Sequence, residues 1–594
     1  MKSFFKIIFG SCLGVILSFV VIFFILMGAA SSISPSSSKK DKAIKSNSIL
    51  SLKLEGEITD RTYEASFMNF SPFGSNAASS IGLFDIEKVL NKAKTDDNIK
   101  ILALDIDKLS MGIASTYQFI QMLEDFKKSN KPVYLYSNGA SQKTILVGAY
   151  ADKVYLNPIA SCEFDGFVLE NMFYTGLLEK VGVQPRIFYA GEFKSATEPF
   201  RLKANSPENI LQLTELLQDV STKYYTSLAQ KLKQNPDSII AYANQLKITQ
   251  AADAKKYGLV SDLKYEDEFF DELKTKLGYK KDDKVNFVSY KTYKESIIPE
   301  KNSSDAQNQI AVLFAEGEIT DGKGEQGIIA SENFLNEIRG IQAKVKDKKV
   351  KALVLRVNSP GGSAYASEQI WRELSLLKKE IPIVVSFGDV AASGGYYISC
   401  ASNKIFAQDN TITGSIGVFG MLFNMQNLLN NKLGITTDAV KTSPYADFGN
   451  STRDWDETEN NAMQRDIDFI YTLFKKRVSE ARNLTEEEVS EIAKGRIYSG
   501  EDAKSIGLVD EIGILKDAIA EAKKLAKINE PKVVYYPEDK KGFDLFLNSI
   551  LGDESAKTKI FSLFQSEQKM YKEIIQLKEY QQPQTRMPLV FKIY

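Results

Sequence analysis

The sequence predicts an α/β protein made of two tandem repeats, each with a parallel sheet. The first observation is a duplication, because residues 55–60 read EGEITD and the same six letters return at 316–321. Near the end of each copy, DAKKYGLV at 253–260 returns as DAKSIGLV at 502–509. The second observation is that β-rich runs alternate with helical patterns in both copies, which is typical of βα units. The third is the apolar run 352–355, which suits a strand buried on both faces.

The two copies are expected to repeat the same order of strands and helices. Strands are predicted in the first copy at 48–54, 99–106, 132–136, 153–156 and 184–190, with a helix at 116–128. Strands are predicted in the second copy at 309–314, 350–357, 382–387, 404–407 and 436–441. A long helix follows in each copy: one with Ser206 as N-cap and Pro207 at its first position, to about Leu232, and one over about 457–482. We interpret these long helices as arms that pack copies or subunits together.

These patterns divide the chain into six segments. They are an N-terminal transmembrane anchor at 1–30, a linker at 31–47, a first α/β repeat at 48–264, a connection at 265–308, a second α/β repeat at 309–530 and a C-terminal tail at 531–594. The tail is charged and aromatic and contains no chemical motif that we identify.

Composition excludes several classes of catalyst. The 594 residues contain no histidine, which rules out a Ser-His-Asp triad, a His-Glu-x-x-His zinc protease and a Cys-His nucleophile pair. Any nucleophile would need Lys, Asp, Glu, Tyr or the N-terminal amine as its base. A net charge of −1 gives no indication of nucleic-acid binding. The sequence has three cysteines, Cys12, Cys162 and Cys400. Because their number is odd and they lie far apart, they indicate neither a disulfide framework nor a metal site. We expect no metal and no organic cofactor.

The N-terminal region predicts an anchor in the lipid bilayer. Residues 7–30 carry no charge, and about 20 apolar residues span a bilayer, whereas a signal-peptide core has roughly 7–15. We therefore expect a retained single-pass anchor, with cleavage after 28–30 as the alternative. The lysines at 39–45 outnumber those before the uncharged run, which favours placing the main part of the chain on the cytoplasmic side. The short basic N-terminus is instead typical of a signal-anchor, which places the main part of the chain outside the membrane.

Two glycine-rich junctions join a strand to a helix in the second copy. Residues 358–362 read NSPGG, and glycines there let backbone N–H groups converge at a helix N-terminus. Such a point can hold a phosphate or the oxyanion of an acyl intermediate, or it can be a tight turn without function. Residues 391–397 read AASGGYY, and Ser393 at this junction is either an exposed nucleophile or a plain N-cap. The presence of both junctions in one copy favours the catalytic interpretation.

The candidate base lies in the other copy. Lys194 in GEFKS must be neutral to accept a proton, so its pKa must fall several units below about 10.4. Burial against Tyr189, Phe193 and Phe200 would lower it, whereas a solvated loop lysine would keep its charge. Spacing alone does not show that Lys194 meets Ser393. Ser415, in TGSIG at 413–417, either hydrogen-bonds the lysine amine or belongs to a glycine-rich turn.

On these motifs the chain resembles a known family over about residues 45–530 and the anchor. SPGG at 359–362, ASGGYY at 392–397, TGSIG at 413–417 and FKSATEPF at 193–200 are similar to those of signal peptide peptidase A (protease IV). The similarity is to the long duplicated bacterial form of this family, peptidase family S49. The resemblance implies two Clp-protease/crotonase-like repeats and a Ser-Lys dyad endopeptidase that degrades remnant signal peptides and other apolar peptides.

The resemblance also implies roles for particular residues. By position, these are Ser393 as nucleophile, Lys194 as general base, Ser415 as the support of the lysine, and backbone N–H groups near Gly361, Gly362 and Gly394 as the oxyanion hole. It further implies a homotetramer on the bacterial inner membrane, with the catalytic region on the periplasmic side. Two alternatives stay open at this point: a crotonase-like acyl-CoA enzyme, which would not need Lys194, and a catalytically silent membrane scaffold.

Overall fold

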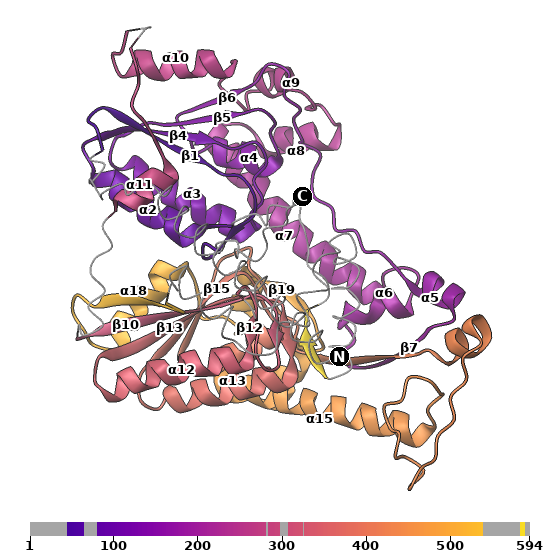
Figure 1. Ribbon diagram of the computed structural model, residues 1–594. Coiled ribbons are helices and arrows are strands. Elements are labelled where there is room, and N and C mark those ends of the chain that lie inside the picture. The colour runs from indigo at the N-terminus through magenta and orange to yellow at the C-terminus, as the bar shows by residue number, and fades with distance from the viewer. Residues whose placement is uncertain are drawn as a thin grey trace, which may run out of the picture.

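The chain folds into two α/β repeats that pack against each other (Figure 1). The computed structural model describes residues 44–63, 80–280, 283–297, 307–324, 326–538 and 583–587. In Figure 1 the first repeat, indigo to magenta, lies above the second, which is red to yellow. The predicted anchor at 7–30 lies outside the described residues. Among the helices that the structure does describe, none combines the length and the apolar character that crossing a bilayer requires.

The first repeat is built on a sheet in which all neighbouring strands are parallel. Its strands, in spatial order, are β8 (Asp262–Leu263), β6 (Lys153–Leu156), β5 (Val133–Ser137), β4 (Ile99–Asp105), β1 (Ser48–Lys53) and β9 (Phe287–Ser289). Alternate strand residues face opposite layers. Leu50 and Leu102 therefore pack on the side of helices α2 and α3, at Leu83–Thr95 and Ile113–Lys127. Ile49 and Tyr134 face α10 (Glu266–Lys276).

The second repeat contains a sheet with the same strand order. The corresponding strands are β20 (Glu511–Ile512), β16 (Lys404–Ala407), β15 (Ile383–Ala392), β13 (Val350–Ser359), β10 (Gln309–Glu316) and β21 (Lys532–Tyr536). The carboxyl end of β15, at residues 390–392, pairs with β17 (Ile412–Gly414). The antiparallel β19 (Ile497–Ser499) then pairs with β17. The shared order shows that the sequence duplication is a structural duplication.

Helices cover both faces of each sheet. The other helices of the first repeat are α4 (Gln142–Gly148), α5 (Thr175–Val181), α6 (Glu198–Arg201), α7 (Pro207–Leu232), α8 (Pro236–Asn244), α9 (Ala251–Lys256) and α11 (Tyr290–Ser296). Those of the second are α12 (Ser331–Lys346), α13 (Ala364–Leu377), α14 (Gly394–Ser399), α15 (Glu457–Arg482), α16 (Glu486–Ile492), α17 (Gly500–Ser505) and α18 (Leu515–Leu525). Both predicted long helices are confirmed as α7 and α15, and the Ser206 side chain caps α7 by accepting from Asn209 N–H at 3.1 Å.

A third sheet joins the two repeats. Its strands, in order, are β12 (Ile329–Ala330), β11 (Ile319–Thr320), β14 (Gly361–Ser363), β22 (Gln584–Arg586), β18 (Val418–Asn424) and β7 (Gln184–Ala190). β7 leaves the first repeat and pairs antiparallel with β18 of the second along its whole length. Because Lys194 follows β7 directly, this pairing carries it to the second repeat.

Nine of the ten predicted strands are confirmed, and the one at 436–441 is wrong. That stretch contains no strand and is exposed, with Val440 fully accessible to solvent. The second-repeat counterpart of β7 is instead β18, which precedes this stretch. β-Prone residues on a solvated loop give no pattern that distinguishes them from a short strand.

Two expected segments contribute strands to the sheets. β9, within the expected connection 265–308, pairs with β1, and β21, within the expected tail 531–594, pairs with β10. Each repeat thus has a helix, α10 or α18, followed by a returning edge strand. The connection and the first part of the tail therefore belong to the repeats rather than lying between or after them.

Candidate active site

Ser393 lies at the junction of β15 and α14, between the two repeats. Its backbone is in the left-handed region, with a φ of 53°, which a residue with a side chain adopts only when its surroundings impose it. The Ser393 N–H donates to Gly414 C=O at 2.8 Å, which holds this conformation. The side chain makes no capping bond to α14. The plain N-cap alternative is therefore wrong, and the hydroxyl is free to serve another group.

That other group is the amine of Lys194, which comes from the first repeat. Lys194 Nζ lies 2.9 Å from Ser393 Oγ, 3.0 Å from Ser415 Oγ and 3.0 Å from the Ser415 carbonyl oxygen. All three side chains are inaccessible to solvent. The structure thus brings together three residues that lie up to 221 positions apart in the chain.

Burial sets the protonation of this lysine. Desolvation lowers the pKa of Lys194 well below its ordinary value, because an ammonium group loses its hydration inside the protein. The groups within hydrogen-bonding distance of Nζ are neutral oxygens, which do not compensate for that loss as a carboxylate would. A neutral amine has a free lone pair, so Lys194 can accept the proton of Ser393.

Glycines make the space for the lysine stem. A Cβ on Gly495 would lie 2.7 Å from Lys194 Cβ, and one on Gly417 would lie 3.1 Å from Lys194 Cδ. Of the aromatic residues expected around the lysine, Tyr189 is 37 % exposed and lies beneath the Arg201 guanidinium instead. Close approach of the Gly495 and Gly417 backbone to the lysine stem, which the sequence analysis did not predict, therefore contributes to the burial of Lys194.

Gln212 on α7 is a supporting residue that the sequence analysis missed. Its buried amide donates to the Phe193 carbonyl and to Ser195 Oγ, both at 3.1 Å, on either side of Lys194. Its carbonyl oxygen accepts from the Ile497 N–H of β19 at 3.1 Å. One side chain therefore fixes the lysine loop to the second repeat. The sequence signal for it was only a glutamine in a helix, which is indistinguishable from a surface residue.

The three candidate oxyanion glycines lie at one place but differ in what their N–H groups do. Gly361 N–H donates to Ser359 Oγ at 3.2 Å, so it is already used. A Cβ placed on Gly361 would lie 2.6 Å from the Gly394 nitrogen, which shows how closely the two junctions meet. Gly361 and Gly362 both have positive φ, at 95° and 157°, and so favour glycine. Gly362 and Gly394 therefore remain the candidate donors to the carbonyl of a bound peptide.

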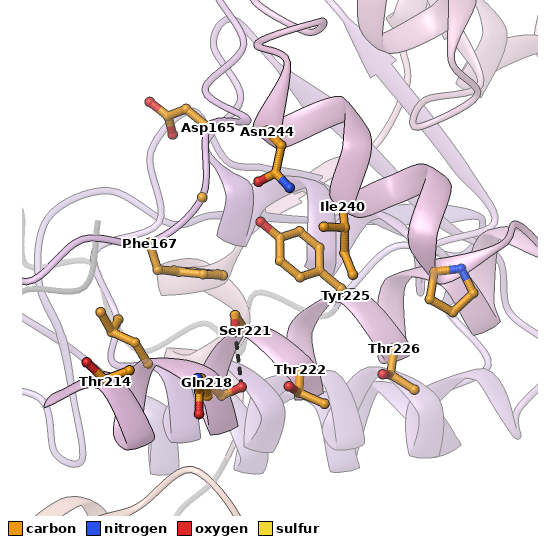
Figure 2. A pocket seen from close by; sticks show the side chains of 13 residues that line it. Asp165, Phe167, Thr214, Gln218, Ser221, Thr222, Tyr225, Thr226, Ile240 and Asn244 are labelled. Atoms are coloured by element: carbon orange, nitrogen blue, oxygen red, sulfur yellow. Dashed lines mark hydrogen bonds between the residues drawn. The ribbon is translucent and has the colours of Figure 1, made fainter. Parts of the chain in front are cut away.

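Two cavities among the described residues lie away from the three catalytic side chains. A cavity of about 510 Å³ lies in the first repeat between α7 and α8 (Figure 2). Figure 2 shows Tyr225, Phe167 and Asn244 around it, with Thr222 and Thr226 along α7. None of the candidate catalytic side chains lines this cavity. The chemistry is therefore located by the buried Ser-Lys contact and not by the cavity.

Comparison with known proteins agrees with this constellation. The pattern of peptidase family S49 matches residues 125–280 and 375–529, once in each repeat. The chain belongs to peptidase family S49. It is 33 % identical to Protease 4 of Salmonella typhi over 521 residues, which are 85 % of this chain and 83 % of that protein.

Two further relatives extend the comparison. Serine protease SPPA, chloroplastic, of Arabidopsis thaliana is 31 % identical over 82 % of this chain and 70 % of its own length. A protein of Enterococcus faecium that bears the name of a signal peptide peptidase SppA is 39 % identical over 46 % of this chain and 78 % of its own length. The chain is accordingly a serine protease of family S49 with two copies of the family's domain.

Proposed function

We propose that this S49 protease is a membrane-anchored endopeptidase that hydrolyses remnant signal peptides with a Ser393–Lys194 dyad. The observation that carries the proposal is the 2.9 Å contact between the buried Lys194 amine and Ser393 Oγ. A crotonase-like acyl-CoA enzyme would not require a desolvated lysine at the serine, and a silent scaffold would require neither residue. Membership of a peptidase family supports the dyad over both alternatives.

The chemistry begins with proton transfer from Ser393 to Lys194. The neutral amine accepts the hydroxyl proton while Oγ attacks the peptide carbonyl carbon. Negative charge then develops on the carbonyl oxygen, where the Gly362 and Gly394 N–H groups stabilise it; one such donor is typically worth about 10²–10³ in rate. Collapse of the tetrahedral intermediate breaks the C–N bond, and the Lys194 ammonium protonates the leaving amine.

Deacylation uses the same groups in reverse. The leaving peptide departs, a water molecule loses its proton to Lys194 and attacks the acyl-serine, and Ser393 Oγ takes the proton back from the lysine. Ser415 accepts a hydrogen bond from Nζ throughout and keeps the lone pair directed at Ser393. Apart from this water molecule, the proton transfers use only side chains of this chain.

The proposed substrates are extended, apolar peptides. Signal peptides released into the bilayer are apolar, and the residues beside Ser393 form a buried apolar cluster of Leu213, Leu216, Ala392, Ile412 and Ile497. We place the protease on the periplasmic side of the inner membrane, anchored by residues 7–30, as a homotetramer. The length of the uncharged N-terminal run supports the anchor, and resemblance to the long family form supports the side and the assembly.

Hydrolysis of a synthetic signal peptide tests the substrate class. Wild-type protein in detergent should cleave it, and should leave a polar peptide of equal length largely intact, with products identified by mass spectrometry. Ser393→Ala and Lys194→Ala should each lower the rate by at least about 10³-fold, as loss of a nucleophile or base does elsewhere. Equal rates on the two peptides would contradict the proposed substrate class, and activity in Ser393→Ala would contradict the dyad.

Cell fractionation tests the anchor separately. The full chain should sediment with inner membranes and be digested by protease added to spheroplasts but not to intact cells. A chain that begins at residue 44 should be released to the soluble fraction. Recovery of the full chain in the cytosol, or its protection in spheroplasts, would contradict the proposed location.

A further inference from the structure

The dyad is buried, although a protease must admit a peptide to its nucleophile. Ser393 and Lys194 are both inaccessible to solvent. The segment that lies along the oxyanion strand β14 is the chain's own residues 583–587, which include β22. β22 pairs antiparallel with β14 on one side and with β18 on the other, so it fills the gap between these two strands. The chain therefore occupies its own peptide cleft.

The hydrogen bonds show the register of this segment. Met587 N–H donates to Pro360 C=O at 2.7 Å, and Ala364 N–H donates to Pro583 C=O at 3.2 Å. Hydrogen-bonded pairs alternate along an antiparallel ladder, so the pair midway between these two, Gly362 with Thr585, is also hydrogen-bonded. The Gly362 N–H thus faces the Thr585 carbonyl. This is main-chain recognition of an extended peptide by strand addition.

The Thr585 carbonyl lies at the candidate oxyanion site. A Cβ on Gly361 would lie 2.1 Å from the Thr585 carbonyl oxygen, and one on Gly394 would lie 2.9 Å from it. Gly394 directly follows the nucleophile. A carbonyl oxygen beside both glycine junctions lies where the main chain of a bound substrate would meet these N–H groups.

Side chains add to the main-chain contacts. Met587 is 2 % exposed and completes the apolar cluster of Leu213, Leu216, Ala392, Ile412 and Ile497. Arg586 pairs with Glu318 at 2.8 Å, and Thr585 Oγ1 donates to the Gly362 carbonyl at 3.2 Å. The cluster includes residues of α7 and so draws on both repeats. The segment is thus held by backbone, charge and an apolar pocket together.

We propose that residues 583–587 are an intramolecular ligand of the peptide cleft, which peptides supplied from outside must displace. The inference rests on the proposed function, because it takes the cleft at Ser393 to be the substrate cleft. A tethered ligand acts at an effective concentration of the order of millimolar, so a peptide at micromolar concentration competes poorly with it. Removal of the segment should therefore strengthen the binding of added peptide.

Binding measured without turnover tests this inference. In a Ser393→Ala background, which keeps the segment uncut, the full chain and a chain ending at residue 582 are compared. The probe is a fluorescein-labelled peptide with the sequence of residues 583–588, followed by fluorescence anisotropy. The shortened chain should bind it at least tenfold more tightly than the full chain does. Equal dissociation constants would overturn the inference.

Point variants guard against misfolding of the shortened chain. In the full-length Ser393→Ala protein, Met587→Asp places a charge in the apolar pocket and should strengthen probe binding as truncation does. Met587→Leu keeps volume and polarity and should leave binding as weak as in the parent. If Met587→Asp and Met587→Leu bind the probe equally, the segment does not occupy the cleft.

The two proposals fail in different ways. Tight probe binding to the shortened Ser393→Ala chain, with no turnover by any chain that retains Ser393, would contradict the proposed function and leave the inference standing. Turnover of a signal peptide that depends on Ser393, with probe binding unaffected by truncation and by Met587→Asp, would overturn the inference alone.

Discussion

At the scale of single residues, the site depends on three side chains in states that are costly elsewhere. Ser393 and Ser415 both have left-handed backbones, with φ of 53° and 51°, and such strain costs about 1–3 kcal/mol for each residue. Lys194 is buried, and its desolvation favours the neutral amine. The hydrogen bonds from Nζ to Ser393 and Ser415 connect the three. The three unusual states therefore meet at one buried set of contacts.

Ser415→Ala should slow the chemistry without weakening substrate binding. Two oxygens of Ser415 accept hydrogen bonds from Lys194 Nζ, the hydroxyl and the backbone carbonyl. The variant removes the hydroxyl and keeps the carbonyl. We expect kcat to fall about 10–100-fold, which corresponds to about 1.4–2.7 kcal/mol, with KM unchanged. Kinetics on a short peptide ester, with Ser443→Ala in an exposed loop as control, measure both parameters.

The pH profile distinguishes this role from a structural one. Loss of an acceptor for N–H bonds destabilises the ammonium form, so the pKa of Lys194 should fall further. The acid limb of kcat should therefore move to lower pH in Ser415→Ala while the plateau drops. A lower plateau with an unmoved limb would contradict the assigned contact.

At the scale of elements, β7 and α7 carry the lysine from one repeat to the serine of the other. β7 pairs with β18, and α7 presents Gln212 to the loop that contains Lys194. The same α7 residue accepts from Ile497 N–H of the second repeat. The division of the catalytic groups between two copies therefore requires elements that cross the interface, and these are two of them.

Gln212→Ala should loosen the lysine loop. The change leaves the buried Ile497 N–H and Phe193 carbonyl without this partner, at a cost of about 1–3 kcal/mol in unfolding free energy. We expect kcat/KM to fall about tenfold because Lys194 is less well positioned. Gln230→Ala, at an exposed position of the same helix, should change neither kcat/KM nor Tm. Unchanged activity in Gln212→Ala would contradict the positioning role assigned to Gln212.

At the scale of the whole molecule, the repeats share a buried charged network. Arg356 of β13 binds Asp60 of the first repeat through two contacts of 2.9 and 3.0 Å. Glu316 accepts from Asp60 N–H at 2.9 Å and from Tyr63 OH at 2.7 Å. Burial, and then the nearby Asp60 carboxylate, raise the pKa of Glu316 to about 7. The interface therefore holds a carboxyl group that takes up a proton near neutral pH.

This network predicts how stability depends on pH. The pKa of Glu316 is higher in the folded protein than in the unfolded chain. Its contribution to the free energy of unfolding is therefore full below the unfolded pKa and is lost as the pH rises through about 7. Wild type should lose up to about 3 kcal/mol between pH 5 and 8 from this group. Glu316→Gln, which stays neutral, should lose less. Thermal unfolding of both proteins across that range measures the difference, and parallel Tm profiles would contradict the assigned pKa.

Much of the fold was predictable because buried parallel strands leave continuous apolar runs. The long helices were placed correctly by a capping serine with a following proline, and by periodicity. The edge strand β9 and the segment 583–587 were missed, because short strands with mixed polarity have no pattern of their own. The 2.9 Å contact of Lys194 with Ser393 rests on β7 crossing between repeats, which spacing along the chain does not encode. Resemblance to the family, and not periodicity, predicted that pair.

Labelling with a fluorophosphonate probe tests the central claim, that Lys194 of one repeat activates Ser393 of the other. Wild-type protein and Lys194→Ala are treated in parallel, labelled residues are mapped by mass spectrometry, and circular dichroism verifies the fold of both. We predict label on Ser393 in wild type and at least about 10³-fold slower labelling in Lys194→Ala. Labelling of Ser393 at the same rate in both proteins, or no label on folded wild-type protein at any pH up to 10, would contradict the claim.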